Sequence, residues 1–238
     1  MGLEQISKDR KPSIEYCKYH FHFTRFFSTM KRILFPIIIL LSAALLFGNG
    51  KYSKHNPYAL QNGDIVFQSG QRGQANAIKK ATNSEWSHVG VVFQREGQWW
   101  VLEAVQPVKY TKLDDFIKRN LKSFHARRLI DASVITPESL ALAQTWGARQ
   151  LDKNYDLKFL WDDEKLYCSE LVWKIYKHAV DIELCEPRPM ESYNLSDPTV
   201  AALVKKRFGS IANLPKYSPT VAPSDLADSP LLIEVPRK

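Results

Sequence analysis

Cys168 stands at the start of a segment with helical periodicity, within the stretch EKLYCSELVWKIYKH at 164–178. A cysteine in the first turn of a helix meets the positive end of the helix dipole and backbone N–H groups that lack a partner within the helix. Both features favour the thiolate, which is the nucleophilic form, and the same N–H groups can hold an oxyanion. Against this, Cys168 also lies on the apolar face of its segment, where a cysteine commonly fills the core. Acids at 162–164 would also oppose a thiolate unless they point away.

Two polar residues interrupt the clearest β-hairpin of the chain, His88 in SHVGVVFQ and Glu103 in QWWVLEAV. A two-residue loop at 96–97 places Glu103 opposite Gly90, and a four-residue loop places it opposite His88. Both even loops put the two side chains on one face, whereas a three-residue loop would separate them. We predict an even loop, because a buried acid and a buried imidazole each cost several kcal/mol and pairing removes much of that cost. A structural His–Glu hydrogen bond without chemistry is the alternative.

Together these residues could form a catalytic set, with Cys168 as nucleophile, His88 as base and Glu103 as the carboxylate that orients the base. Sequence spacing does not show that the helix start meets the hairpin. Two other arrangements stay open. A Cys168–Cys185 disulfide would make the chain a non-catalytic binding module, and the three residues could hold a metal ion. We expect no metal and no cofactor.

The elements that must position these residues are short strands alternating with helices. The helix at 136–151 has the clearest start, with Thr136 as N-cap, Pro137 at its first position and Glu138 in its first turn. The mixture predicts an α+β fold with antiparallel strands. Residues 209–238 contain five of the thirteen prolines and are predicted to be an extended tail packed on the domain. Strands are predicted at 65–67, 87–94, 98–105 and 124–130, a strand and a helix within 108–119, and helices at 71–81, 168–179 and 196–208.

Composition limits the class of protein. A chain of 238 residues with 45% hydrophobic content predicts a single globular domain over 51–238. Three cysteines are too few for a disulfide scaffold. The net charge is +8, and about half of that excess lies in residues 1–50. The remainder has no dense basic stripe, so we expect no nucleic-acid partner.

The segment 30–50 has the layout of a secretory signal peptide. Lys31 and Arg32 precede an uncharged apolar run, 33–48, and Gly48-Asn49-Gly50 offers small residues before a cut at Lys51. The run is short for a membrane-spanning helix, and an uncleaved anchor is the alternative. Residues 1–29 do not fit a signal and are interpreted as a non-native upstream extension or a disordered segment. The working protein is therefore expected outside the cytoplasm, periplasmic or extracellular, with membrane contact only through 33–48 if the segment is retained.

Several motifs resemble those of the permuted papain-like amidases of the YaeF/YiiX type, which are relatives of the NlpC cell-wall peptidases. The resemblance is strongest over 60–180. It implies a circularly permuted papain-like fold, a small antiparallel sheet or barrel packed against a helix that carries the cysteine. It also implies that Cys168, His88 and Glu103 are the catalytic residues. The motifs are NGDIVF (62–67), SEWSHVGVVF (84–93), VLEA (101–104), NYDLKFLWDDEKLYCSELVWKIY (154–176) and VAPSDLADSPLL (221–232).

The resemblance implies attack on an amide or ester carbonyl, an acyl-enzyme, and hydrolysis. The leading expectation is an exported thiol hydrolase acting on an amide bond in a peptide or acyl-amide, with peptidoglycan as one candidate. Lipid-ester cleavage or acyl transfer is the alternative enzyme class. Ser169 is expected to hydrogen-bond within the first helical turn, and Asp64 to make a structural turn or strand-end hydrogen bond. Residues that could contact substrate or oxyanion are Ser87, Tyr155, Tyr167 and Ser169.

Overall fold

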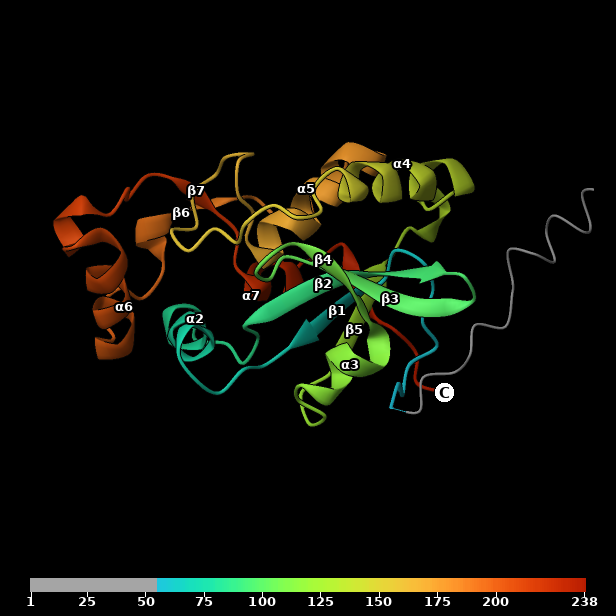
Figure 1. Ribbon diagram of the computed structural model, residues 1–238, viewed down its shortest axis with the longest axis horizontal. Coiled ribbons are helices and arrows are strands. Elements are labelled where there is room, and N and C mark those ends of the chain that lie inside the picture. The colour runs from blue at the N-terminus through green and yellow to red at the C-terminus, as the bar shows by residue number, and fades with distance from the viewer. Residues whose placement is uncertain (1–54) are drawn as a thin grey trace, which may run out of the picture. The chain divides into compact units, whose positions relative to one another are not determined.

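A computed structural model describes residues 55–238, and the fold is described over that part of the chain. Its centre is a six-stranded antiparallel sheet with the strand order β4-β3-β2-β1-β5-β8 (Figure 1). The predicted α+β class is confirmed. The outer strands are β4 and β8, so these residues show a sheet and not the barrel offered as its alternative. The strands are β1 (Ile65–Gln68), β2 (His88–Arg95), β3 (Gln98–Glu103), β4 (Lys109–Lys112), β5 (His125–Leu129) and β8 (Leu232–Glu234).

Helices surround the sheet, and their starts follow the capping signals in the sequence. Thr136 Oγ1 accepts a hydrogen bond from the Ser139 backbone N at 3.2 Å at the start of α4, and Asp197 caps α6 in the same manner. A separate pair of two-residue strands, β6 (Arg188–Pro189) and β7 (Pro219–Thr220), joins two loops. The helices are α2 (Gln74–Thr82), α3 (Leu113–Lys118), α4 (Pro137–Ala148), α5 (Cys168–Val180), α6 (Pro198–Phe208) and α7 (Pro223–Ala227), with 3₁₀ turns η1 (Ala132–Val134), η2 (Met190–Ser192) and η3 (Ile211–Asn213).

The β2–β3 hairpin has the two-residue loop. Arg95 pairs with Gln98, and the loop residues Glu96 and Gly97 have φ of 51° and 70°, both in the left-handed region. This register brings Gly90 beside Glu103, on the face that His88 also occupies. A Cβ at Gly90 would lie 2.5 Å from the Val101 side chain and 2.9 Å from the Leu102 carbonyl oxygen, so the close approach requires glycine.

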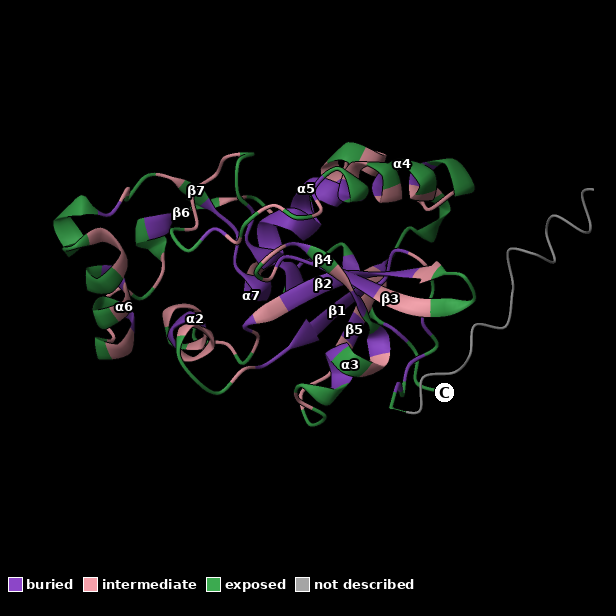
Figure 2. Ribbon diagram, in the orientation of Figure 1, coloured by how far each residue is buried: buried purple, intermediate pink, exposed green. Residues whose placement is uncertain are grey.

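The sheet buries both faces. One face packs against α4 and α5, where Leu171, Val172 and Ile175 meet Phe67 and Val91. The other face packs against α3. Figure 2 shows α5 buried along most of its length, whereas the outer side of α4 is exposed. Full burial of such side chains contributes about 1.5–3 kcal/mol each to folding, and this packing fixes where α5 begins relative to the hairpin.

The C-terminal segment is more than an extended tail. The sequence predicts an extended tail packed on the domain; the segment does pack there, and it also supplies α7 and the edge strand β8. Glu234 pairs with Arg127 of β5, and Val221 and Leu226 are buried in the main core. The five prolines misled the prediction because they do not prevent regular structure here: Pro223 opens α7, Pro219 lies in the short strand β7, and no proline lies within β8.

The predicted upstream extension, 1–29, and the signal peptide or anchor, 30–50, lie outside the described residues. Within 55–238, no helix combines the length and the apolar character that crossing a bilayer requires.

Candidate active site

The N-terminus of α5 is tied to the segment that precedes α7. Ser169 Oγ donates to the Val221 carbonyl oxygen at 2.7 Å, and the Val221 N–H donates to the Tyr167 hydroxyl at 3.2 Å. Glu170 Oε2 accepts from the Tyr167 backbone N at 3.3 Å. The expectation that Ser169 bonds within its own turn is therefore wrong, because the buried Val221 carbonyl needs a donor. These bonds fix Cys168 as the first residue of the helix, with 1% of its surface exposed.

His88 and Glu103 meet as the hairpin predicted. The His88 Nε2 and Glu103 Oε2 atoms are 2.6 Å apart, and the Glu103 side chain has no exposed surface. Arg119 donates hydrogen bonds to both carboxylate oxygens of Glu103, from Nη1 to Oε2 at 2.7 Å and from Nη2 to Oε1 at 2.5 Å. Thr111 also donates to Oε1, at 2.5 Å. Burial raises the pKa of Glu103, but the hydrogen bonds and charges of His88 and Arg119 outweigh it and lower the pKa to about 2. Glu103 is thus a fixed anion that orients the ring of His88.

Cys168 and His88 shift each other's pKa, so the thiol and the imidazole ring lie within interaction range of each other. Since Nε2 faces Glu103, Nδ1 is the nitrogen left for the sulfur. Burial raises the pKa of Cys168, but the hydrogen bond and charge of His88, the Tyr155 hydroxyl and the Val89 N–H outweigh it, and the net pKa is lowered. Burial lowers the pKa of His88, whereas Cys168 and Glu103 raise it, to about 10 overall. The arrangement favours a thiolate–imidazolium pair.

The acids that precede the helix turn away from the sulfur. Asp163 pairs with Lys174 Nζ at 2.8 Å and is 82% exposed. Asp162 Oδ1 accepts from the backbone N of Glu164 at 3.0 Å, within its own loop. Glu170 on the first turn pairs with Lys174 at 2.9 Å. The acids at 162–164 therefore lie in solvent or in local turns, and the objection to a thiolate that they raised from sequence is removed.

The other predicted residues divide into two groups. The Tyr155 hydroxyl lies 4.0 Å from Cys168 Sγ, so this side chain belongs to the site. Ser87 Oγ accepts from the Gly70 N–H at 2.7 Å and fixes a loop beside His88. Asp64 instead accepts from the Gln61 N–H at 2.6 Å and pairs with Arg128 at 2.7 Å, the structural role expected of it.

Sequence reasoning did not find Arg119, Thr111, Gln74 or Arg207. The first two bind the Glu103 carboxylate. The Gln74 amide bonds the Tyr155 hydroxyl, and Arg207 bonds the Gln74 side chain. Pairing the strand at 109–112 with the strand that carries Glu103 would have indicated Thr111, since it lies on the strand next to Glu103. The others come from distant segments and leave no local pattern.

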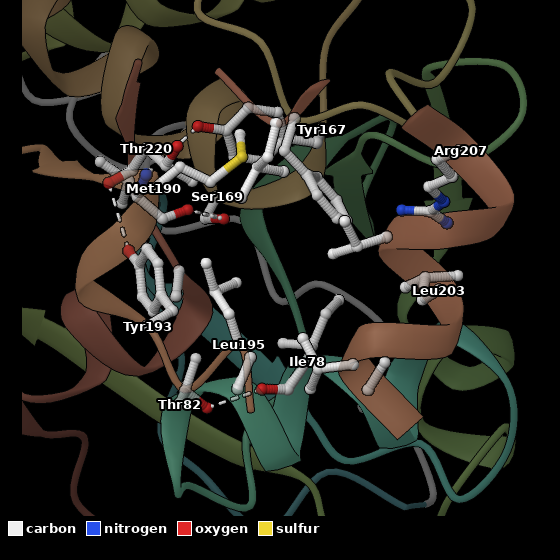
Figure 3. Close-up of a pocket in the computed structure, with 18 of the residues that line it drawn as sticks. Ile78, Thr82, Tyr167, Ser169, Met190, Tyr193, Leu195, Leu203, Arg207 and Thr220 are labelled. Atoms are coloured by element: carbon white, nitrogen blue, oxygen red, sulfur yellow. Dashed lines mark hydrogen bonds between the residues drawn. The ribbon is translucent and has the colours of Figure 1, made fainter. Parts of the chain in front are cut away.

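Two cavities adjoin the Cys168–His88 pair. Cys168, Tyr167 and Ser169 line a cavity of about 100 Å³ whose walls are almost wholly apolar and come mainly from α2, α6 and the loops before α6 and α7. Figure 3 shows Ile78, Leu195 and Leu203 around this cavity, with the Arg207 guanidinium at its edge. We call it the apolar pocket. His88, Ser87 and Tyr155 line a larger groove of about 710 Å³, with Arg72, Arg119 and Lys165 along it, which we call the polar groove.

A cysteine that opens a helix and faces a histidine–acid pair on an antiparallel sheet defines the papain-like class. Here the histidine and the acid precede the cysteine in the chain, the reverse of the papain order.

Comparison with known proteins makes the assignment specific. The sequence model described as "Permuted papain-like amidase enzyme, YaeF/YiiX, C92 family" matches residues 59–235, and the chain belongs to this family. It is 37% identical over 178 residues to the protein named "Uncharacterized protein YiiX" of Escherichia coli K12, covering 75% of this chain and 87% of that protein. A crystal structure described as that of the metalloprotein yiiX from Escherichia coli O157:H7 superposes with a TM-score of 0.69 at 36% identity, covering 75% of this chain and 97% of that one. The resemblance inferred from the motifs is confirmed.

Proposed function

We propose that this protein is a thiol hydrolase that cleaves an amide bond through Cys168, His88 and Glu103. The observation that carries the proposal is the 2.6 Å contact between His88 Nε2 and the buried Glu103 carboxylate, beside a Cys168 thiol whose pKa is lowered by His88. The Cys168 thiolate attacks the carbonyl carbon and forms a C–S bond, and the oxyanion lies at the N-terminus of α5. As the C–N bond breaks, His88 gives its proton to the leaving amine. His88 then takes a proton from water, which attacks the thioester and frees the acid and the thiol.

The two cavities indicate which part of the substrate lies where. Because His88 must protonate the leaving group, the amine lies on the His88 side, in the polar groove. The acyl group is bonded to sulfur and lies on the Cys168 side, where the apolar pocket opens. This division supports a substrate with an apolar acyl group and a polar amine.

A cell-wall peptide is the second candidate substrate. Arg72 and Lys165, the cationic side chains along the polar groove that are not paired with Glu103, suit a leaving group that carries carboxylates, as peptide stems do. The signal-like segment at 30–50 supports an exported location, where such peptides are accessible. This candidate needs no occupant in the apolar pocket.

A metal ion has no part in the proposal. Residues 55–238 contain no group of three or more His, Cys, Asp and Glu side chains that could hold one. Both carboxylate oxygens of Glu103 are already bonded to Arg119. The site around Cys168 therefore does not fit the description of the related structure as a metalloprotein, and no step is routed through a metal.

A chain-length series tests the proposal. N-acyl amides of one polar amine, with acyl groups from acetyl to octanoyl, are assayed for hydrolysis, and the acyl-enzyme is trapped for mass spectrometry. We expect the acyl mass on Cys168 and a kcat/KM that rises with chain length, since each buried CH₂ contributes about 0.8 kcal/mol. Leu203→Trp narrows the apolar pocket and abolishes the rise, whereas Leu142→Trp on exposed α4 does not. Acylation without any chain-length dependence favours the peptide candidate, and hydrolysis that survives Cys168→Ala refutes the proposal.

A further inference from the structure

A second chain of hydrogen bonds, separate from the His88–Glu103 pair, reaches the thiol. It begins on α6, where Arg207 Nη2 donates to Gln74 Oε1 at 2.5 Å. Gln74, the first residue of α2, donates from Nε2 to the Tyr155 hydroxyl at 2.8 Å. The Tyr155 hydroxyl lies 4.0 Å from Cys168 Sγ. Four residues from distant parts of the sequence therefore form one relay, and two of them, Arg207 and Gln74, do not touch the sulfur.

The direction of each hydrogen bond in this relay is fixed by chemistry. A guanidinium group can only donate, so the Gln74 carbonyl oxygen must face Arg207. The Gln74 amide nitrogen must then face Tyr155, and because it can only donate, the Tyr155 oxygen accepts. The hydroxyl proton of Tyr155 is left to point elsewhere, and the sulfur of Cys168 is the polar atom within reach. The relay thus sets Tyr155 as a donor toward the reacting atoms.

The position of the Arg207 guanidinium carries a free-energy cost, because it is partly buried with an unsatisfied nitrogen. It lies at the edge of the apolar pocket, its Nη1 atom is buried, and no atom of residues 55–238 hydrogen-bonds that nitrogen. Figure 3 shows its guanidinium at the pocket edge. A stacking contact over the Phe159 ring, 5.1 Å from its centroid, offsets part of the cost. A leucine or methionine would fill this position without an unsatisfied group, so packing alone does not account for the arginine.

We propose that Arg207 and Gln74 are positioning residues that hold the Tyr155 hydroxyl as a hydrogen-bond donor to the group on Cys168. The donor stabilises the thiolate before attack. After attack it stabilises the negative charge that develops on the group bonded to Cys168. Burial keeps the pKa of Tyr155 above its ordinary value, so the hydroxyl retains the proton that it donates. Charge at Arg207 polarises the chain and strengthens each bond in it. The catalytic role given to this hydrogen-bond donor rests on the proposed function, whereas the experiment that tests the donor does not depend on that function.

The test is the pH midpoint of Cys168 alkylation by iodoacetamide, which requires no substrate. Tyr155→Phe removes the donor, and we expect the midpoint to rise by about half a unit to one unit. Gln74→Glu keeps the shape of the side chain but can only accept, so it draws the Tyr155 proton away from the sulfur, and the midpoint rises similarly. Gln106→Glu is the matched control. Gln106 lines the same groove but accepts from the Tyr155 backbone N, so this variant adds the same charge without reversing the hydroxyl.

Combining the substitutions separates a relay from a charge effect. If Gln74 acts through Tyr155, Gln74→Glu shifts the midpoint in the wild-type background by more than Gln106→Glu does. In the Tyr155→Phe background, Gln74→Glu should then shift the midpoint only by the amount that Gln106→Glu produces through charge alone. An unchanged midpoint in Tyr155→Phe overturns the inference, as does a full Gln74→Glu shift in the Tyr155→Phe background. Because alkylation is read without hydrolysis, these outcomes are independent of whether the proposed amide substrate is correct.

Discussion

Cys168 and Cys185 are both free thiols, yet their surroundings act on them in opposite directions. Burial raises the pKa of both. At Cys185 burial and the Asp225 carboxylate together raise the pKa to about 12, against the opposing charge of Arg188. At Cys168 the donors around the sulfur outweigh burial, and the pKa falls. The pKa of the same side chain is raised in one region and lowered in the other.

This difference shows that the degree of burial does not distinguish a core cysteine from a nucleophile. Cys168 is the more buried of the two and packs within the main apolar cluster, as the core interpretation of the sequence expected. It is also the one that faces His88, Tyr155 and the Val89 N–H. What decides is whether hydrogen-bond donors reach the sulfur, because they stabilise the charged form where water cannot.

The largest effect expected from this comparison is on acylation. Cys168→Ala should remove the covalent intermediate and lower turnover by at least about 10³-fold, whereas Cys185→Ala should leave turnover within about twofold. Intact-mass spectrometry of protein mixed with substrate reads both. An acyl adduct that follows Cys185 would reverse the roles assigned to the two thiols.

A smaller effect is expected when the charge of Glu103 is removed. Glu103→Gln keeps the shape but loses the anion that holds His88 as an imidazolium, and kcat/KM should fall by about 10–100-fold. Asp64→Asn is the matched control, since Asp64 is an equally buried acid paired with an arginine, Arg128, and has no contact with the thiol. It should lower stability and leave the turnover of the folded protein unchanged. Equal losses of turnover in both variants would mean that Glu103 serves the fold alone.

The smallest effect concerns the anchoring of α5. Ser169→Ala leaves the Val221 carbonyl without its donor and should cost about 1–3 kcal/mol of stability by urea unfolding. Ser229→Ala breaks a comparable buried bond to the Leu184 carbonyl, far from the sulfur in the chain. We expect similar losses of stability in both, with slower alkylation of Cys168 in Ser169→Ala only. Slower alkylation in both variants would point to general loosening of the fold.

The hairpin and its pair of polar residues could be predicted, because alternation and the Glu96-Gly97 turn are local signals. The helix start at Thr136 was predictable for the same reason. The meeting of Cys168 with His88 was not a local property. Only the resemblance to a family supported it, since no spacing rule says which strand a helix start will face.

The supporting residues escaped prediction for a physical reason. Arg119 reaches Glu103 only because α3 packs on the sheet, and Arg207 reaches Gln74 across 133 positions of sequence. Each such contact satisfies a buried polar group, and the need for a partner becomes visible only when burial is known. The β-strand in the C-terminal segment was missed because its pairing with β5 is equally non-local.

The most direct test of the central claim is the rate of Cys168 alkylation as a function of pH, in the wild type and in His88→Gln. The wild type should react with a midpoint below that of an ordinary thiol, because His88 supplies both a hydrogen bond and a charge. In His88→Gln the largest effect that offsets burial is lost and only Tyr155 and the Val89 N–H remain, so the midpoint should rise and the rate near pH 7 should fall at least about tenfold. The same midpoint in both proteins would contradict the account, since the histidine would then play no part in activating the thiol.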